Sequence, residues 1–367
     1  RDRITRYSTS LLYMLCWALI APTAFAEDLL SVYQQALDAD PTFRAADAAH
    51  LAALEARPQS RAALLPVVSL SGNVSRERYD PRTTGPRTYA TNKTYTLGLS
   101  QPVFRLDRFI ALEQADSRIA QADAEYTAAQ QDLAIRVATT YFSLLGAQDK
   151  LAFVRADKLA LTRTLDQARQ RFEVGLAAIT DSLKAQAAYD IAVSDEISAE
   201  QLLADSREAL RELTGKLPDQ PAILQAEIPL LSPEPAKEDE WVTAASEQNP
   251  QVLAARAAAT TAREEVRVQR SGHLPTLDAT ASYSYRDSNF SGVIPLERDD
   301  SAVGLELNLP LYQGGLITSQ TRQSRHLYNH AMEEQARQQR AIERQTRDNY
   351  RGVISGISRV NALARAI

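Results

Sequence analysis

The sequence predicts an α+β membrane protein in which several subunits share one β-barrel that continues into long coiled helices. Three observations lead to this fold class. The first residues have the pattern of a secretion signal, four segments alternate strictly between polar and apolar residues, and a long stretch without proline has heptad spacing.

The composition places the chain among ordinary folded proteins. It has 367 residues, of which 24% are charged and 44% hydrophobic, and a net charge of −5. These values exclude a disordered chain and a protein with many membrane-spanning helices. Acidic and basic residues are mixed along the sequence, which argues against a nucleic-acid-binding face.

Residues 1–26 are predicted to be a secretory signal. Three arginines precede the apolar run from Leu11 to Ile20, and Ala24-Phe25-Ala26 supplies a small-residue cleavage site before Glu27. The run is shorter than the roughly 20 residues that a membrane-spanning helix needs. The alternative is a buried N-terminal helix. Cys16, the only cysteine, lies in this signal, so we expect a mature protein without thiols or disulfides.

The rest of the chain is a tandem duplication. Its landmarks recur at a nearly constant spacing of 208 or 209 residues. We therefore expect a first structural repeat at residues 27–216, a proline-rich segment between the repeats at 217–240, and a second, incomplete repeat at 241–367. The recurring pairs are Asp40-Pro41 and Asn249-Pro250, Leu65-Pro66 and Leu274-Pro275, Pro102 and Pro310, and Tyr141 and Tyr350.

Each repeat reads as helix, strand, polar loop, strand and long helix. The first opens with a helix from Asp28 to Ala39. A second helix starts at Asp40-Pro41, where a carboxylate can cap the helix and proline occupies its first position. Pro58 falls within helical sequence and predicts a kink, whereas Arg267 is its counterpart in the second repeat.

Four segments have the alternation of strands with one polar and one apolar face. They lie near residues 68–75, 94–100, 277–286 and 303–309. A soluble sheet with one wet face would give the same pattern. The secretion signal, a segment length of about 10 residues and the long polar loops near 76–92 and 287–300 favour strands that cross a bilayer.

Four strands cannot close a membrane barrel alone. Each unpaired backbone group in lipid costs several kcal/mol, and the smallest membrane barrels have about 8 strands. The chain must therefore contribute a quarter, a third or a half of a shared barrel, and the residue pattern does not choose among these.

The helices are too long for a globular core. From Asp107 to Glu173 the pattern is helical over 67 residues, which corresponds to about 100 Å. Its apolar residues follow heptad spacing, as in a coiled coil. The seam comprises Leu112, Ala115, Ile119, Ala122, Tyr126, Ala129 and Leu133.

A helical hairpin follows. Gly175, within Val174-Gly175-Leu176, has the position of the glycine that ends a helix. Thr180 is predicted as the N-cap of the next helix, with Asp181 in its first turn, where the helix dipole favours an acid. That helix is expected to run to Thr214. The second repeat begins its own long helix after Gln313-Gly314-Gly315.

Several stretches resemble the TolC family of outer-membrane efflux and type I secretion proteins, and the resemblance covers residues 27–367. They are Val32-Tyr33-Gln34-Gln35-Ala36, residues 170–176 running into Ile179-Thr180-Asp181, Gly272-His273-Leu274-Pro275-Thr276-Leu277, and Leu309-Pro310-Leu311-Tyr312-Gln313-Gly314-Gly315.

The resemblance implies a homotrimer whose protomers each give four strands to a 12-stranded outer-membrane barrel, continuous with a periplasmic coiled-coil barrel. It implies a passive exit duct for tripartite efflux pumps and type I protein secretion. The implied partners are a periplasmic adaptor protein, an inner-membrane transporter of the ABC or RND type, and outer-membrane lipid. The cargo, the particular pump and the ability of this chain to fold unaided stay open.

Two sites carry over by motif. Thr180 and Asp181 match family positions that hold the closed periplasmic tip, and Val174, Gly175 and Leu176 match the tip that contacts the adaptor. A helix start and a glycine turn would also explain these residues without any function. The partners of Thr180 and Asp181 belong to a second hairpin, which we expect a C-terminal truncation to have removed.

Other functions fit less well. A periplasmic adaptor also has a signal and a hairpin, but it would show lipoyl-like halves instead of duplicated two-faced strands. An ordinary porin lacks heptad helices. We expect no enzyme activity, cofactor or metal site, because no catalytic constellation is present. His326 and His330 are predicted on a solvated face, and His50 and His273 are expected to stand alone.

Overall fold

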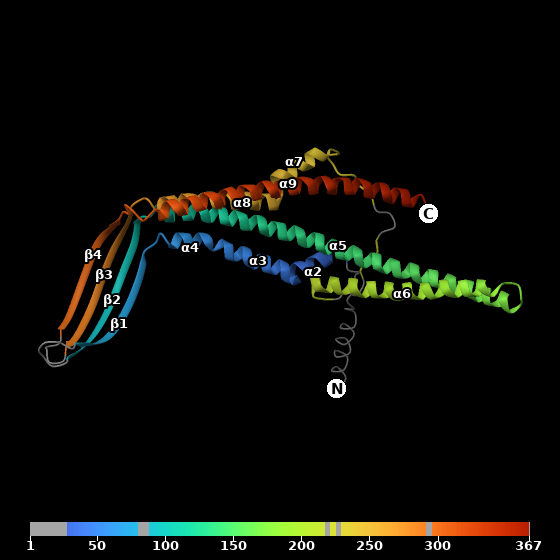
Figure 1. Ribbon diagram of the computed structural model, residues 1–367, viewed down its shortest axis with the longest axis horizontal. Coiled ribbons are helices and arrows are strands. Elements are labelled where there is room, and N and C mark those ends of the chain that lie inside the picture. The colour runs from blue at the N-terminus through green and yellow to red at the C-terminus, as the bar shows by residue number, and fades with distance from the viewer. Residues whose placement is uncertain (1–27, 80–87, 217–220, 225–228, 291–295, 367) are drawn as a thin grey trace, which may run out of the picture. The chain divides into compact units, whose positions relative to one another are not determined.

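The computed structural model describes residues 28–79, 88–216, 221–224, 229–290 and 296–366 (Figure 1). The predicted signal lies outside this part. The chain forms two compact units, one from residues up to 44 together with 131–229, the other from 45–130 together with 230–367. Among the described helices, none combines the length and apolar character needed to cross a bilayer.

The second unit contains a four-stranded antiparallel sheet in the order β1-β2-β3-β4. The strands are β1 (Val67–Tyr79), β2 (Thr88–Phe104), β3 (Thr276–Phe290) and β4 (Leu296–Asn308). They are 13 to 17 residues long, so the predicted length of about 10 residues is too short. Much of the sequence predicted as polar loop continues the ladder, because backbone pairing needs no apolar side chains.

In the central part of the sheet, the strand register places polar residues on one face and apolar residues on the other. Ser71, Thr96 and Ser284 are register partners on one face. Leu99, Ala281 and Val303 are register partners on the opposite face. The two-faced character that the sequence predicts is therefore continuous from strand to strand.

Helices α3 (Pro41–Leu54) and α4 (Ala56–Ala62) are separated at Glu55. Pro58 has no backbone N–H to donate to the carbonyl of Leu54, so the helix breaks at this turn. Its counterpart Arg267 lies within the unbroken helix α8 (Pro250–Ser271). The kink predicted from Pro58 is confirmed as a break.

Helices α7 (Glu238–Gln248), α8 and α9 (Leu316–Ala364) pack together in the second unit. Glu238 binds Arg351 at 2.9 Å and Arg347 at 3.1 Å, which fastens the start of α7 to α9. The hydrogen bond from Arg351, followed by that from Arg347, holds the pKa of Glu238 below its ordinary value. α7 is thus held to α9 by charge.

The first unit consists of α2 (Leu29–Ala39), α6 (Ile179–Thr214) and the later part of α5 (Leu106–Glu173). α5 has 68 residues and begins one residue before the predicted start. Every residue of the predicted heptad seam is buried or half-buried. The unit's core contains the fully buried side chains of Val32, Leu133, Val137, Leu144 and Leu210.

Asp40 caps α3 as predicted, and Asp28 and Asn249 cap α2 and α8 in the same way. The carboxylate of Asp28 accepts the backbone N–H of Ser31 at 2.8 Å. Asp40 accepts that of Phe43 at 2.9 Å, and Asn249 accepts that of Gln251 at 2.9 Å. The equivalent positions of the two repeats therefore start their helices in the same way.

Candidate functional site: barrel wall and hairpin tip

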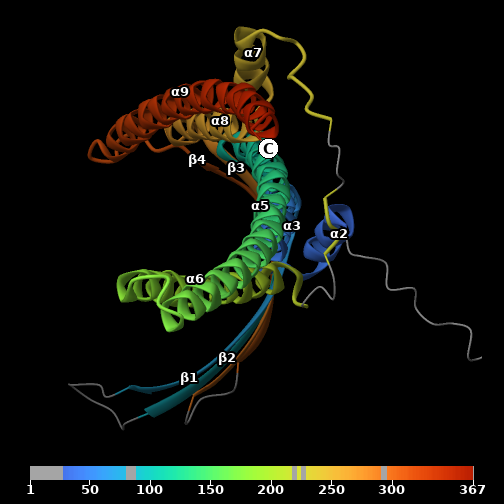
Figure 2. The same cartoon turned by 90° about the vertical axis from the view of Figure 1, so that its right-hand side faces the viewer.

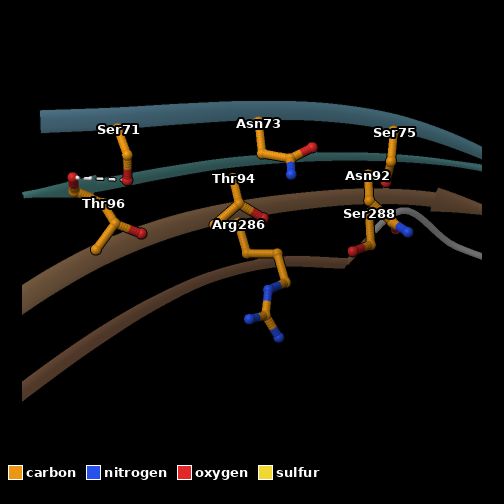
Figure 3. Close-up of a pocket in the computed structure, with 8 residues that line it drawn as sticks. All are labelled: Ser71, Asn73, Ser75, Asn92, Thr94, Thr96, Arg286 and Ser288. Atoms are coloured by element: carbon orange, nitrogen blue, oxygen red, sulfur yellow. Dashed lines mark hydrogen bonds between the residues drawn. The ribbon is translucent and has the colours of Figure 1, made fainter.

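One face of the sheet is hollowed, and the hollow is lined by polar side chains. Eight side chains from β1, β2 and β3 line a hollow of about 450 Å³, and Figure 3 shows them pointing to the same side of the ribbon. A barrel closed toward this side would have a hydrophilic lumen. The lining residues are Ser71, Asn73, Ser75, Asn92, Thr94, Thr96, Arg286 and Ser288.

The opposite face is apolar and uncovered. Val303 is 89% exposed, and Leu70 is 76% exposed, although both are strongly hydrophobic. A soluble protein rarely leaves so large an apolar patch in water. This face has the chemistry of a surface that contacts lipid. Its other exposed members are Val68, Val74, Leu97, Leu99, Leu305 and Leu307.

The apolar face ends at an aromatic pair followed by charges. The rings of Tyr95 and Tyr285 stack at 6.5 Å, and one row further out Lys93 binds Asp287 at 3.2 Å. From Leu277 to Tyr285 the apolar face of β3 rises by about 26 Å along the strand. Because strands in a barrel are tilted, the height of this face across the membrane is somewhat smaller than its length along the strand. It is close to the lipid-facing band of roughly 25 Å that outer-membrane barrels carry.

An ion pair fixes the junction between the sheet and α5. Arg105, between β2 and α5, binds Asp278 of β3 through two bonds, Nη2 to Oδ2 at 2.6 Å and Nε to Oδ1 at 3.1 Å. Gln101 donates to the carbonyl oxygen of Leu64 at 2.9 Å. The direction in which α5 leaves the sheet is therefore set by specific polar contacts.

The hairpin tip begins with the glycine turn that the sequence predicts. The N–H of Leu176 donates to the carbonyl of Arg171 at 2.7 Å, and that of Gly175 to Phe172 at 2.9 Å. These two bonds form a Schellman motif, which requires a left-handed residue. Gly175 supplies it with φ 77°.

The prediction that Thr180 is the N-cap of α6 is wrong. The helix begins at Ile179, and Ala178 holds the N-cap position with extended backbone and no capping side chain. The helix starts earlier because the short turn after Gly175 leads directly into helical geometry. Asp181 lies in the first turn, as predicted.

The structure places the predicted site residues together at the tip, all of them exposed. Val174 is 69% and Leu176 72% exposed. Ile179 and Leu183, which the sequence analysis did not select, are 56% and 61% exposed and lie one helical turn apart. Their spacing of four residues was the signal that could have found them.

The two helices of the hairpin are linked by charged residues. Arg155 of α5 binds Glu196 at 3.2 Å and Glu200 at 2.7 Å, and Lys158 also binds Glu196. The hydrogen bond from Lys158 is the main cause of the lowered pKa of Glu196. These contacts hold the hairpin helices side by side.

The histidines are spread over the second unit. His326 and His330 are exposed. His50 does not stand alone as expected, because its Nε2 lies 2.7 Å from Asp123 and its ring stacks on Tyr126 at 4.9 Å. Across the residues that the structure describes, no three His, Cys, Asp or Glu side chains gather as a metal site would need.

The comparison with protein families finds a match in two segments of the chain. The family described as "Outer membrane efflux protein" matches residues 32–216 and 241–366. The chain belongs to this family.

Curated relatives of this outer membrane efflux protein extend over most of its length. It is 35% identical to outer membrane protein TolC of Vibrio cholerae over 353 residues, covering 95% of this chain and 79% of the relative. It is 34% identical to TolC of Escherichia coli, covering 93% and 71%. The alkaline protease secretion protein AprF of Pseudomonas aeruginosa is 32% identical, with 84% and 66% covered.

Solved structures share the fold of this efflux protein. VceC of Vibrio cholerae matches with a TM-score of 0.68 and 21% identity, covering 86% of this chain and 75% of that one. CusC matches with a TM-score of 0.76 and 14% identity, covering 92% and 78%. The outer-membrane channel OprN matches with a TM-score of 0.74 and 18% identity, covering 92% and 76%.

These likenesses confirm the predicted fold class, in which a protomer gives four strands to a trimeric outer-membrane barrel continuous with helices. This efflux protein lies in the outer membrane and extends into the periplasm. It is an exit channel of the efflux and type I secretion kind, not a periplasmic adaptor. The family and fold are those of a passive channel.

Proposed function

We propose that this channel is the passive duct of a tripartite assembly whose hairpin tips dock a periplasmic adaptor and open under an inner-membrane ABC or RND transporter. The observation that supports docking most directly is the exposed apolar surface at the tip. Val174 and Leu176 are each more than two-thirds exposed, directly beside the rigid turn at Gly175. Exposed apolar side chains on a rigid support are suited to protein contacts.

The gate belongs to the same tip. Thr180 and Asp181 begin α6 and are exposed, and the described part of the chain contains no side-chain partner for either. A hydroxyl and a carboxylate at this place can bind a neighbouring hairpin by hydrogen bond and ion pair. Closure through such bonds is reversible at low cost, because exposed ion pairs contribute only about 0–1 kcal/mol each.

The duct itself is a passive conduit and catalyses no reaction. The wall offers hydroxyl, amide and guanidinium groups toward the lumen, which solvate cargo without binding it strongly. Energy for export comes from the transporter. We also propose that residues 1–26 direct secretion and are removed.

Recordings in planar bilayers test the gate. Asp181→Asn and Thr180→Val should each raise the open probability of the purified channel, because each removes one closing bond. Asp195→Asn is the matched control, since Asp195 is an exposed acid of α6 away from the tip. Gating that is identical in the wild type and in the Asp181 and Thr180 variants would refute the gate.

Adaptor binding tests the docking surface. Leu176→Glu should weaken capture of the adaptor and reduce export from cells that lack their own exit channel. Leu159→Glu introduces the same charge at a position that is 55% exposed on α5, outside the tip. Equal loss in both variants would point to a general defect of the helices and would contradict docking at the tip.

A further inference from the structure

The sheet has two open edges, β1 and β4, which lie on opposite sides in Figure 1. Lipid allows no open edge, so each must pair with another chain. We propose that β4 pairs with β1 of the next protomer at a stagger of four or six residues, so that Asp299 forms an ion pair with an arginine of β1, Arg76 or Arg78 respectively. The inference rests on the trimeric barrel and adds the register and residues of its seam.

The register within the protomer gives the starting point. Gly72, Tyr95, Tyr285 and Asp299 lie in one row across the four strands. Barrel strands tilt by about 35–45°, and four strands spaced about 4.8 Å apart therefore accumulate a stagger of roughly 13–19 Å. This is about four to six residues per protomer at 3.3 Å each. Only even values keep the two faces continuous, so the stagger is four or six.

The lengths of the edge strands show in which direction the stagger between β4 and β1 runs. A stagger of four toward the polar-loop end brings all 13 residues of Leu296–Asn308 opposite the 13 residues of Val67–Tyr79. A stagger of six still pairs most of both strands. The opposite direction would leave only about five pairs at this spacing, which cannot satisfy the backbone in lipid.

The charges at the two edges are complementary in this arrangement. A stagger of four sets Asp299 opposite Arg76 and Glu297 opposite Arg78, and a stagger of six sets Asp299 opposite Arg78. In the described part of the chain, neither arginine has an ion-pair partner, and Arg76 lies 5.2 Å above the ring of Tyr89. Asp299 accepts a hydrogen bond from Tyr283 at 3.0 Å.

The protomer already contains the same arrangement between two of its own strands. Lys93 of β2 and Asp287 of β3 are register partners on the apolar face, and their charged atoms are 3.2 Å apart. The seam would repeat this pair two strand interfaces further around the barrel. Pairing of β1 with β1, or of β4 with β4, would instead oppose like charges, so the edges favour a head-to-tail ring.

Disulfide cross-linking of the full chain reads the register directly. Val303→Cys should form covalent trimers with Gly72→Cys if the stagger is four, or with Val74→Cys if it is six. Register partners have Cα atoms about 4.5–5.5 Å apart, within reach of a disulfide. Val303→Cys with Val68→Cys is the control, because these two residues lie opposite each other only at zero stagger. A stagger of four or six moves them apart by about 13 Å or more.

The possible outcomes distinguish a wrong register at the seam from the absence of a trimer. Covalent trimers with Gly72→Cys or Val74→Cys, and none with Val68→Cys, support the register. Cross-linking with Val68→Cys, or with none of the three in a protein that sediments as a trimer, overturns the seam alone. A monomer in detergent and in lipid overturns the trimeric barrel as well.

Charge exchange tests the ion pair. Asp299→Arg should lower the temperature at which the trimer dissociates in detergent, and adding Arg76→Glu and Arg78→Glu should restore it. Asp287→Arg is the control, because Lys93→Asp, within the same protomer, should rescue it and the β1 exchanges should not. Rescue of Asp299→Arg by neither β1 exchange would refute the pairing.

Discussion

The contact between Asp40 and Arg136 joins the start of α3 to α5 within the first unit. Arg136 Nη2 lies 2.8 Å from Asp40 Oδ2, and the two side chains are 31% and 3% exposed. The same carboxylate accepts the N–H of Phe43. Asp40 therefore acts both as a helix cap and as a nearly buried anion, and these two roles can be separated by mutation.

The second repeat provides the separating substitutions. At a spacing of 209 residues, Asn249 stands where Asp40 does, and Gln345 where Arg136 does. Asn caps helices about as well as Asp, so Asp40→Asn removes the charge and keeps the cap. Asp40→Ala removes both. Arg136→Gln leaves the carboxylate without its cation.

The magnitude follows from the geometry. Two unit charges about 4 Å apart attract by roughly 4 kcal/mol at an effective dielectric constant near 20. Partial exposure of Arg136 and its second bond to Asp132, at 2.8 Å, weaken the pair. We expect a coupling of about 2 kcal/mol, a loss of about 2–3 kcal/mol for Asp40→Asn, and about 1 kcal/mol more for Asp40→Ala.

Urea unfolding in detergent, followed by circular dichroism at the helix signal, measures this double-mutant cycle. The double variant Asp40→Asn with Arg136→Gln should lose less stability than the sum of the two single variants. Additive losses would refute the pairing. An Asp40→Ala variant no less stable than Asp40→Asn would refute the capping role.

The same pair predicts a pH dependence. Burial raises the pKa of Asp40, but the hydrogen bonds from Arg136 and the backbone of Phe43 outweigh it and lower the pKa below the ordinary value. The stabilisation is therefore complete above the ordinary pKa and is lost as the pH falls through the lowered one. Asp40→Asn should remove this part of the acid dependence.

Three further changes follow from the geometry. Gly175→Ala should destabilise the turn by about 1 kcal/mol, because Gly175 has a left-handed backbone conformation. Faster hydrogen exchange at the tip would report this loss. The control Gly146→Ala, within α5, should instead stabilise the helix. Glu196→Gln should speed hydrogen exchange of the hairpin at low salt and have little effect in 1 M salt; an equal effect at both would contradict an ionic clamp. Arg105→Ala should cost about 2–3 kcal/mol by leaving Asp278 unpaired, and restored stability in Arg105→Ala with Asp278→Ala would support the pair.

Sequence reasoning located the elements whose ends are set by local chemistry. Asp40, predicted as a cap, starts α3 by accepting the N–H of Phe43, three positions away. Gly175 ends α5 because only a left-handed residue fits there. Such signals lie within one helical turn and can be read from a single chain.

Features that depend on distant residues could not be predicted in the same way. The strands extend past the apolar band because polar residues such as Arg76 and Thr91 still pair through their backbones. Thr180 has a side chain suited to capping, but the preceding turn starts the helix at Ile179. The bond of His50 to Asp123 joins residues 73 positions apart, which no local pattern encodes.

The central claim is that the four strands share a barrel with the polar face toward water and the apolar face toward lipid. Single cysteines at residues 68–75 of β1, in the protein reconstituted in lipid, test it with a charged thiol reagent. Ser71→Cys and Asn73→Cys should react and reduce the conductance, whereas Leu70→Cys and Val74→Cys should resist the reagent. Reaction at all positions alike, or at Leu70 and Val74 in preference, would contradict the account.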